Sequence, residues 1–591
     1  MTMKKLLRLA LSALLLLTMT VPAQASSEEP AAASSDAPET TEPMELTQPG
    51  IRFFDSVTVG GKSTGGSFYL YSPEHPHDYD ILSNCMNGVV FVYPDKPLAD
   101  EDAAEALIAE LGLDEIAESF PAYIILPLPQ NGESWTEADL DLYWEAQFFL
   151  AGGLVDANTQ PPQGEYVRHT MNTLQYVIGE GSGASFIHNV LSQNAARIAG
   201  IAAFGGEIDE DLPIGLSVPA YLVNAPESVV SYWRAANGTD AGEGSEFYNS
   251  TYVQKKVFVA EGGDTFDREN VQTAWRNILS RTMRLGVAAN VVVTTMDQSE
   301  WVLMDWLELE DIGLNRYSFD FDAASGTAEY YTEYKTKSYD TVHLYVPAAV
   351  ESEPDKAAPL LVTLHGGSDD PLNIVMGCGW AQKAVDENFI IVSPSNEDPD
   401  HVISILDYVD GLYNIDHSRI YVTGFSMGGM GASNVGKAHP EVFAAIAPMG
   451  SAGGSYIEDF DSSGYDLPVC MIVGGSDNLN VSEDENGDPV VGGMMPASIT
   501  QAFEINELNP GEKDYSANPY WGYTPDQYQV VIDKDLEWRI SSFYRDDFAA
   551  PMVQCVTLIG AGHSNADYMA TIAWDFMSRF ARAEDGSLLE N

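Results

Sequence analysis

The residues with the clearest chemical potential stand at 424–428 and read Gly-Phe-Ser-Met-Gly. They follow a strand-like stretch, RIYVTG, and precede a run of small residues with helical character. This G-x-S-x-G pattern is typical of a nucleophile elbow, in which a serine sits on a sharp turn between a strand and a helix. Glycines on either side let the backbone pack closely there, and the helix N-terminus directs N–H groups at the reacting centre. The pattern predicts that Ser426 is a nucleophile.

A serine hydroxyl needs a general base to remove its proton, and the base needs an acid to orient it. Only two histidines follow Ser426. His439 comes at the end of the expected elbow helix, so it should face away from the turn. His563 follows an apolar strand, VTLIG, and should lie at the carboxyl edge of the sheet, where ligands bind in open α/β folds. We therefore expect His563 to be the base.

The orienting acid should come between the serine and the histidine, at the end of a strand. Asp477 directly follows the apolar stretch VCMIVGGS and fits that position. Asp461, Asp466 and the acidic run at 483–488 are alternatives. The oxyanion of an acyl-transfer intermediate needs N–H donors, which the residue after the nucleophile and an early loop supply. The sequence predicts the N–H of Met427 and that of either Gly366 or Gly367, which follow the strand LLVTL.

The elements that must hold these residues form a repeating pattern. Short, fully apolar runs rich in Val and Ile alternate with longer helical stretches, which indicates buried parallel strands in βαβ units. The elbow region YVTGFSMGG also has a counterpart in the first half, YVIGEGSGA at 176–184. Three more strand-like segments match in the same order, 88–94 with 360–366, 121–129 with 388–396 and 218–228 with 467–477. We expect tandem α/β-hydrolase-like domains, each a mostly parallel sheet flanked by helices.

The first copy lacks the chemical groups of the second. Gly181 stands where the alignment puts the nucleophile, and Ser182 comes one position late. No histidine occurs between His188 and His343, and the strand expected to precede the missing base is VVVTTM at 291–296. Tyr-Pro-Asp at 93–95 replaces the His-Gly-Gly of the oxyanion loop. The first half is therefore predicted to be a degenerate copy without hydrolase activity.

The second half, with LHGG before the elbow and GAGHSNADY after it, resembles exported polyhydroxybutyrate-depolymerase and feruloyl-esterase-like α/β-hydrolases. It is also similar to dienelactone-hydrolase and prolyl-oligopeptidase-like relatives. The resemblance implies ester hydrolysis through an acyl-serine, without a cofactor. It departs at 478–550, a long insertion that could form an aromatic-lined wall or a small packed subdomain. Trp521 in this insertion, and Trp380 after the oxyanion loop, are candidate substrate contacts. Alternatives are a serine peptidase and a non-catalytic binding protein with a vestigial triad.

Composition limits the partners. The chain has 591 residues and a formal net charge of −60, with 88 Asp and Glu against 28 Lys and Arg. Such a surface repels nucleic acid and anionic membranes, so a neutral substrate is expected. Together with the resemblance, this implies a small-molecule or polymeric ester. The oligomeric state is left open. The Cys and His spacings match no metal motif, and no metal site is predicted. The four cysteines are far apart in the chain and are expected to be buried free thiols, with one disulfide as the alternative.

The N-terminus has the pattern of an export signal. A basic start is followed by 13 apolar or small residues, too few to span a bilayer, and by Ala-Gln-Ala at 23–25. We expect cleavage after Ala25 and secretion. The predicted organisation is a signal peptide at 1–25, a disordered acidic linker at 26–49, the degenerate domain at 50–318, the catalytic domain at 319–585 and a tail at 586–591.

Overall fold

The computed structural model describes most of the chain from Pro49 onward. The described residues are 49–591 apart from 56–57, 60–61, 64–65, 75–86, 121, 151–173, 261–265, 286–301, 306–308, 332–337, 368–370, 452–463, 478, 485–486, 488, 493–494, 517 and 534–535. The predicted signal peptide, nearly all of the predicted linker, Cys85 and the VVVTTM segment therefore lie outside the described residues. Within them, no helix is long and apolar enough to cross a membrane.

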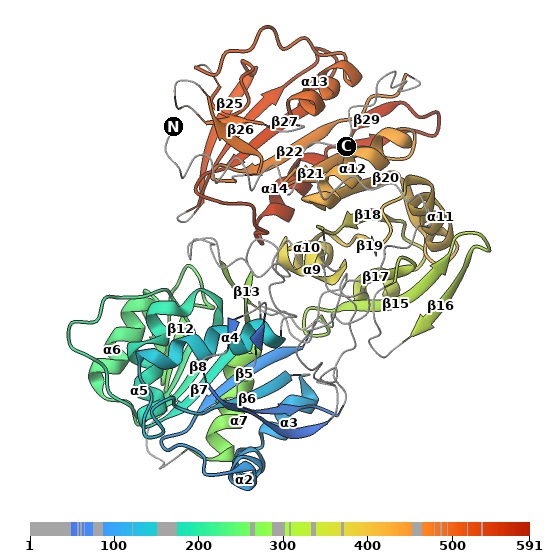
Figure 1. Cartoon of the computed structure of the whole chain (residues 1–591). Helices are drawn as coiled ribbons and strands as arrows, with labels where there is room; N and C mark the ends of the chain where they lie inside the picture. The colour runs from blue at the N-terminus through green and yellow to red at the C-terminus, as the bar shows by residue number, and fades with distance from the viewer. Residues whose placement is uncertain are drawn as a thin grey trace, which may run out of the picture. The chain divides into compact units, whose positions relative to one another are not determined.

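The first sheet has ten strands, and its central pairs are parallel (Figure 1). Their order across the sheet is β1 (Gly50–Phe54), β4 (Phe68–Ser72), β6 (Ala122–Pro127), β5 (Gly88–Tyr93), β7 (Gln175–Glu180), β8 (Ile198–Phe204), β9 (Ala220–Val223), β12 (Lys256–Ala260), β11 (Glu246–Tyr248) and β10 (Ala241–Glu243). The strands from β6 to β12 run parallel, and antiparallel pairs close both ends.

The second sheet has eleven strands and repeats this plan. Its order is β16 (Thr327–Tyr331), β15 (Leu314–Asp322), β17 (Thr341–Pro347), β19 (Ile390–Pro394), β18 (Ala358–Leu364), β20 (Ile415–Phe425), β21 (Ala445–Met449), β22 (Val469–Gly474), β27 (Val553–Leu558), β26 (Leu536–Phe543) and β25 (Gln527–Asp533). From β15 to β25, each strand pair has the direction of its counterpart in the first sheet.

Helices cover both faces of each sheet, because successive strand residues point to opposite sides and both sides are apolar. On β5, Val89 and Phe91 belong to the core on one face of the sheet, which is shared with α4 (Leu140–Leu150), α5 (Ser182–Asn189) and α6 (Glu227–Ala236). Val90 and Val92 belong to the core on the other face, which is shared with α2 (Glu101–Leu111), α3 (Leu113–Ser119) and α7 (Arg268–Asn277). On the second sheet, α11 (Pro399–Asp410), α12 (Met427–Ala438) and α13 (Met495–Ile505) cover one face. The other face carries α9 (Pro371–Gly377), α10 (Trp380–Glu387) and α14 (Met569–Met577). The predicted fold class, α/β with mostly parallel sheets flanked by helices, is confirmed.

Individual hydrogen bonds also recur at matching places in the two sheets. The hydroxyl of Tyr176 in β7 donates to the Thr282 carbonyl at 2.9 Å, and that of Tyr421 in β20 donates to the Phe580 carbonyl at 2.8 Å. In each half, a buried arginine close to the acceptor of the tyrosine also donates to a backbone carbonyl. Arg284 Nε donates to the Ile198 carbonyl at 2.9 Å, and Arg582 Nε donates to the Phe443 carbonyl at 3.2 Å.

The structure corrects two predicted boundaries. The boundary at 318/319 falls inside β15, which pairs along its length with β17, so the second sheet begins at Leu314. Residues 588–590, predicted to lie in a tail, form β29 (Leu588–Glu590) and pair with β28 (Phe580–Arg582). The strand paired with β9 is β12, as β27 is paired with β22 in the second sheet. In each case a strand partner decided the assignment, and strand pairing is not visible in the apolar pattern of a single segment.

The insertion at 478–550 is a packed part of the second sheet's layers. It supplies α13, which covers one face, and the β25–β26 hairpin, which extends the sheet beyond β27. Of its described aromatic residues, Phe503, Trp521, Tyr523 and Phe543 are buried in the core, whereas Tyr528 is exposed. The packed alternative is therefore the correct one for these elements.

The three described cysteines, Cys378, Cys470 and Cys555, are buried free thiols, as expected. Cys470 and Cys555 belong to the neighbouring parallel strands β22 and β27, but each packs into the core on a different face of the sheet. Burial raises the pKa of both thiols, which favours the unreactive protonated form.

Candidate active site

Ser426 lies at the tip of a tight turn between β20 and α12. Its backbone has φ 56° and ψ −113°, a left-handed φ that side chains other than glycine rarely adopt. The Ser426 N–H donates to the Met449 carbonyl of the neighbouring strand at 2.9 Å, which anchors the turn to the sheet. The side chain is thereby held above the carboxyl edge of the sheet, at the N-terminus of α12.

Two glycines allow this turn to form. A Cβ on Gly428 would lie 2.0 Å from the Leu364 carbonyl oxygen, and one on Gly424 would lie 2.1 Å from the Gly428 carbonyl oxygen. Both distances are shorter than any side chain tolerates. The two glycines of the G-x-S-x-G pattern are thus required by backbone approach, in agreement with the reason the sequence suggested.

The structure brings Ser426, His563 and Asp477 into one chain of hydrogen bonds. His563 Nε2 lies 2.8 Å from Ser426 Oγ, and His563 Nδ1 lies 2.8 Å from Asp477 Oδ2. His563 is 7% exposed and Asp477 is fully buried. An imidazole held between a hydroxyl and a buried carboxylate can accept the hydroxyl proton, while the carboxylate stabilises the resulting positive charge.

Asp477 is fully buried and lies among several hydrogen-bond donors. Oδ1 accepts from the N–H groups of Leu479 at 3.0 Å and Asn480 at 3.2 Å, and Oδ2 accepts from Asn480 Nδ2 at 2.7 Å in addition to His563. A buried carboxylate is costly unless its oxygens are hydrogen-bonded, and these donors meet that requirement.

Backbone contacts join the loop that carries the acid to the loop that carries the base. The Gly475 N–H donates to the Leu558 carbonyl at 2.7 Å, and the Ser476 N–H donates to the Ala561 carbonyl at 2.8 Å. A Cβ at Gly474 would stand 2.2 Å from the Gly562 carbonyl oxygen, so the loops can approach this closely only at glycine. The Asp477–His563 distance is therefore set by backbone, on rigid strand ends.

Two of the predicted oxyanion donors, Met427 and Gly367, lie next to each other at the start of α12. Met427 is the first residue of α12, so its N–H has no acceptor within the helix. A Cβ built on Gly367 lies 3.9 Å from Met427 Cβ, which places this part of the loop after β18 next to the helix start. Residues 368–370 of that loop lie outside the described residues. Gly366 and Gly367 both remain candidates for the second donor.

The chain is similar to several known esterases and to a depolymerase. No family model matches the chain. Three curated relatives do. It is 30% identical to poly(3-hydroxyalkanoate) depolymerase C of Paucimonas lemoignei, over 35% of this chain and 55% of that protein. It is 28% identical to the bifunctional acetylxylan esterase/xylanase XynS20E of Neocallimastix patriciarum, over 23% of this chain and 21% of that protein. It is 27% identical to feruloyl esterase B of Thermothelomyces thermophilus, over 18% of this chain and 42% of that protein.

The matches cover at most about half of each relative's length. Their names confirm the predicted resemblance to polyhydroxybutyrate-depolymerase and feruloyl-esterase-like hydrolases. Among solved structures, an acetyl xylan esterase from Aspergillus awamori is 16% identical, with a TM-score of 0.27 over 38% of this chain and 89% of that one.

The other candidate acids and bases have different roles. Asp466 accepts two hydrogen bonds from Arg545, at 2.7 and 2.8 Å, and so belongs to an ion pair. His439 lies near the exposed Asp400 and Glu441, and His365 Nδ1 contacts the Gly366 carbonyl at 2.7 Å. Asp461 lies outside the described residues. Among the residues described, no group of three or more His, Cys, Asp or Glu side chains could hold a metal ion.

The two predicted substrate contacts are corrected by the structure. Trp380 is fully buried, with its ring centroid 6.3 Å from that of Phe389. Trp521 is 3% exposed, and its Nε1 donates to Thr557 Oγ1 at 2.9 Å. Both are core residues, because an apolar indole in a helix or loop packed on a sheet is buried more often than it is displayed. Phe425 was not predicted as a residue of the site, although it directly precedes Ser426. The centroid of its ring lies 5.1 Å from that of the His563 ring.

The corresponding turn of the first half has the same backbone conformation but lacks the serine nucleophile. Gly181, between β7 and α5, has φ 53° and ψ −111°. Asp95 occupies the space beside it, since a Cβ on Gly181 would lie 2.1 Å from Asp95 Oδ1. That carboxylate accepts the Ser182 N–H at 2.9 Å, and Ser182 Oγ donates to the Asp95 carbonyl at 2.6 Å. Burial raises the pKa of the neighbouring Glu180, and a hydrogen bond from the Asp95 N–H opposes the rise.

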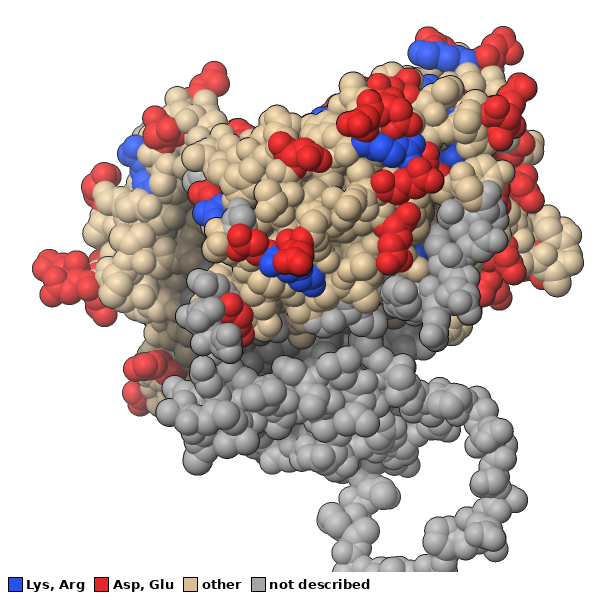
Figure 2. Space-filling view, turned by 90° about the horizontal axis from the view of Figure 1, so that it is seen from above, with Lys and Arg blue, Asp and Glu red and all other residues tan. Residues whose placement is uncertain are grey.

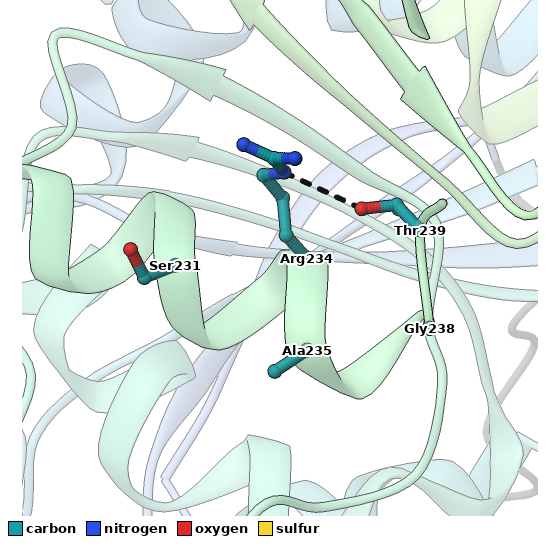
Figure 3. A pocket seen from close by; sticks show the side chains of 5 residues that line it. All are labelled: Ser231, Arg234, Ala235, Gly238 and Thr239. Atoms are coloured by element: carbon teal, nitrogen blue, oxygen red, sulfur yellow. Dashed lines mark hydrogen bonds between the residues drawn. The ribbon is translucent and has the colours of Figure 1, made fainter. Parts of the chain in front are cut away.

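A small pocket elsewhere in the first half is lined by Ser231, Arg234, Ala235, Gly238 and Thr239, at the end of α6 (Figure 3). Arg234 Nε donates to Thr239 Oγ1 at 3.3 Å, and the guanidinium lies 4.1 Å from the centre of the Phe247 ring. The arginine is thus already engaged by the pocket's own residues.

Proposed function

We propose that this chain is a secreted serine carboxylic-ester hydrolase that acts through an acyl-serine intermediate on a neutral ester. The observation that carries the proposal is the chain of two 2.8 Å contacts from Asp477 through His563 to Ser426, at the tip of a strained elbow. The esterase and depolymerase names of the curated relatives support the same reaction class.

In the first half-reaction, His563 Nε2 takes the proton of Ser426 while Oγ attacks the ester carbonyl carbon. The carbonyl oxygen becomes an anion and accepts the N–H of Met427 and of Gly366 or Gly367. Asp477 keeps its negative charge and stabilises the imidazolium. The tetrahedral intermediate then collapses as the ester C–O bond breaks, and His563 gives its proton to the departing alcohol.

In the second half-reaction, water takes the place of the alcohol. His563 removes a proton from the water as it attacks the acyl carbon, and the same N–H groups hold the second oxyanion. Cleavage of the acyl–Oγ bond releases the carboxylic acid and returns the proton to Ser426. Every step uses side chains and backbone N–H groups of this chain.

The charge of the molecule supports a neutral substrate. Figure 2 shows Asp and Glu side chains across the face seen from above, with fewer Lys and Arg. An anionic ester or a nucleic acid would be repelled by such a surface. The classes that fit are feruloyl or acetyl esters on polysaccharide, polyester chains and short-chain esters. The export-signal pattern at 1–25 supports secretion with cleavage after Ala25, and N-terminal sequencing of the secreted protein tests that site.

We also propose that the chain consists of two copies of one fold and that the first is not catalytic. The matching strand orders and the equivalent Tyr176 and Tyr421 hydrogen bonds support the duplication. Asp95 fills the place beside Gly181 that a nucleophile would need. Its carboxylate also takes the Ser182 N–H, the equivalent of the Met427 donor.

A substrate panel tests the proposed activity against the alternatives. Wild type and Ser426→Ala are compared on p-nitrophenyl acetate, p-nitrophenyl butyrate, methyl ferulate and a peptide p-nitroanilide. We expect serine-dependent cleavage of the esters and not of the anilide. Comparable cleavage of the anilide would support a serine peptidase instead. Failure on every substrate, together with no labelling of Ser426 by a fluorophosphonate, would indicate a binding protein.

A further inference from the structure

Asn480 lies behind the acid of the candidate site. It follows Asp477 by three residues and is 9% exposed. Its side-chain Nδ2 lies 2.7 Å from Asp477 Oδ2, the oxygen that also accepts from His563 Nδ1. The same Nδ2 donates to the Gly450 carbonyl. Both partners are acceptors only, so they fix the amide orientation, because the flipped amide would direct its own oxygen at two oxygens.

The Gly450 contact links the acid to the nucleophile. Gly450 ends the strand-to-loop turn after β21, and the preceding residue, Met449, accepts the Ser426 N–H at 2.9 Å. The Gly450 N–H in turn donates to the Ile472 carbonyl in β22, the strand that leads to Asp477. One amide group thus joins the loop of the acid to the backbone that holds the serine.

Asn480 also affects the charge of the carboxylate. Its Nδ2 lies 3.4 Å from His563 Nδ1, and both nitrogens are donors when His563 donates to Asp477, so the two compete for the same Oδ2. A donor on a carboxylate oxygen stabilises the ionised form and makes that oxygen a weaker base. Loss of the donor should therefore make Asp477 more basic and strengthen its interaction with the imidazolium.

We propose that Asn480 is a positioning residue of the hydrolase site, which orients Asp477 toward His563 and limits the basicity of that carboxylate. The inference rests on the proposed function, and it assigns a role to a residue that the Ser-His-Asp pattern in the sequence does not single out. Asn480 acts through Asp477 and touches no reacting atom.

The test uses the full chain with Asn480→Leu, which keeps the volume and removes the donor. Asn506→Leu is the matched control. Asn506 is fully buried in the same half, and its side chain donates only to the Leu467 and Ala502 carbonyls. Rates are expressed per site that reacts with a fluorophosphonate, so that loss of folded protein does not count as loss of activity.

For Asn480→Leu we expect kcat to fall ~10- to 100-fold, the range for loss of one hydrogen bond to a charged group, with KM changed by less than about twofold. The acidic limb of the kcat/KM profile should move to higher pH by about half a unit or more. Asn506→Leu should lower the thermal midpoint and leave both the rate per labelled site and the profile unchanged. An Asn480→Leu enzyme with wild-type kcat per labelled site and an unmoved acidic limb would overturn the proposal.

A second measurement separates this proposal from the proposed function. The pKa of His563 is measured by NMR on protein labelled in the histidine rings, without any substrate. We expect a higher pKa in Asn480→Leu than in wild type, whatever the wild-type protein hydrolyses. If wild type shows neither ester cleavage nor labelling, the proposed function fails. An unchanged His563 pKa would overturn the role of Asn480 even if esters are cleaved.

Discussion

Gly181 and Ser426 share one backbone conformation, with φ 53° and ψ −111° at the first and φ 56° and ψ −113° at the second. Each residue also donates its N–H to the carbonyl of the neighbouring strand, Gly181 to Phe204 at 2.9 Å and Ser426 to Met449 at 2.9 Å. The elbow is therefore present twice, and a side chain strains it in only one copy. Glycine adopts this φ without strain, whereas serine holds it at a cost in stability.

This relationship predicts that replacing Ser426 by glycine removes activity but relieves backbone strain. Ser426→Ala and Ser426→Gly should both reduce ester turnover by at least about 10³-fold, because no nucleophile remains. Ser426→Gly should in addition be more stable than Ser426→Ala, by ~1 kcal/mol, since it relieves the positive φ. Urea unfolding of the two variants measures the difference. Equal stabilities would contradict the strain, and turnover above a tenth of wild type would exclude Ser426 as the nucleophile.

The first-half elbow should not accept a side chain while Asp95 is present. Gly181→Ala places a methyl group about where Asp95 Oδ1 now lies, so the carboxylate must leave the Ser182 N–H. We expect a loss of ~1–3 kcal/mol of stability, from the displaced hydrogen bond and the positive φ.

A double-mutant cycle with Asp95→Gly checks this interpretation of the first-half elbow. The cost of Gly181→Ala should be smaller in the Asp95→Gly background, because the clash is gone and only the backbone strain remains. Additive effects of the two substitutions would show that Asp95 does not fill the site. Ester turnover should stay at the wild-type level in all three variants, which checks that the first half is not catalytic.

Asp477→Asn should lower kcat far more than it lowers stability. The amide would present an N–H to His563 Nδ1, so that Nε2 carries the hydrogen and cannot accept the Ser426 proton. Replacing the triad aspartate of a serine protease by asparagine lowers kcat about 10⁴-fold through the same wrong tautomer, and we expect a loss of that order here. Stopped-flow acylation with p-nitrophenyl acetate measures it. A loss of kcat below about tenfold would indicate that another carboxylate orients His563.

Acid should destabilise the first half through His188. This fully buried side chain accepts from Trp233 Nε1 at 3.0 Å and lies 3.2 Å from the Gly205 carbonyl, an arrangement that fits neutral imidazole. Burial lowers its pKa from 6.5 to about 4. Because the unfolded chain takes up the proton first, the stability from neutral His188 is complete above pH 6.5 and is lost as the pH falls toward 4.

The loss should be ~1.4 kcal/mol per pH unit in this window, about 3 kcal/mol in total. Urea unfolding at pH 7, 6 and 5 of wild type and His188→Gln measures it, and the difference between the two proteins removes the contribution of the many carboxylates. Parallel curves for the two proteins would contradict the prediction. Esterase activity at pH 7 should be the same in both.

Much of the site could be predicted from sequence because its chemistry is encoded in local patterns. The G-x-S-x-G run determines the elbow, since only glycines permit the approach of Gly428 to the Leu364 carbonyl. The order Ser, Asp, His and the position of each residue after an apolar strand then select Asp477 and His563, because parallel strands bring their carboxyl ends to one edge. The internal match between 176–184 and 421–429 indicates the repeated strand plan for the same reason.

The tertiary structure alone decided what depends on partners far apart in the chain. Trp380 and Trp521 are candidate substrate contacts in the sequence, yet packing on the sheet buries them. Asn480 has no motif, and its place between Asp477 and Gly450 follows from two loops meeting. Asp95 occupies the empty elbow only because β5 and β7 are neighbours. Local residue order specifies turns and strand ends, whereas burial and hydrogen-bond partners arise only when the sheet is assembled.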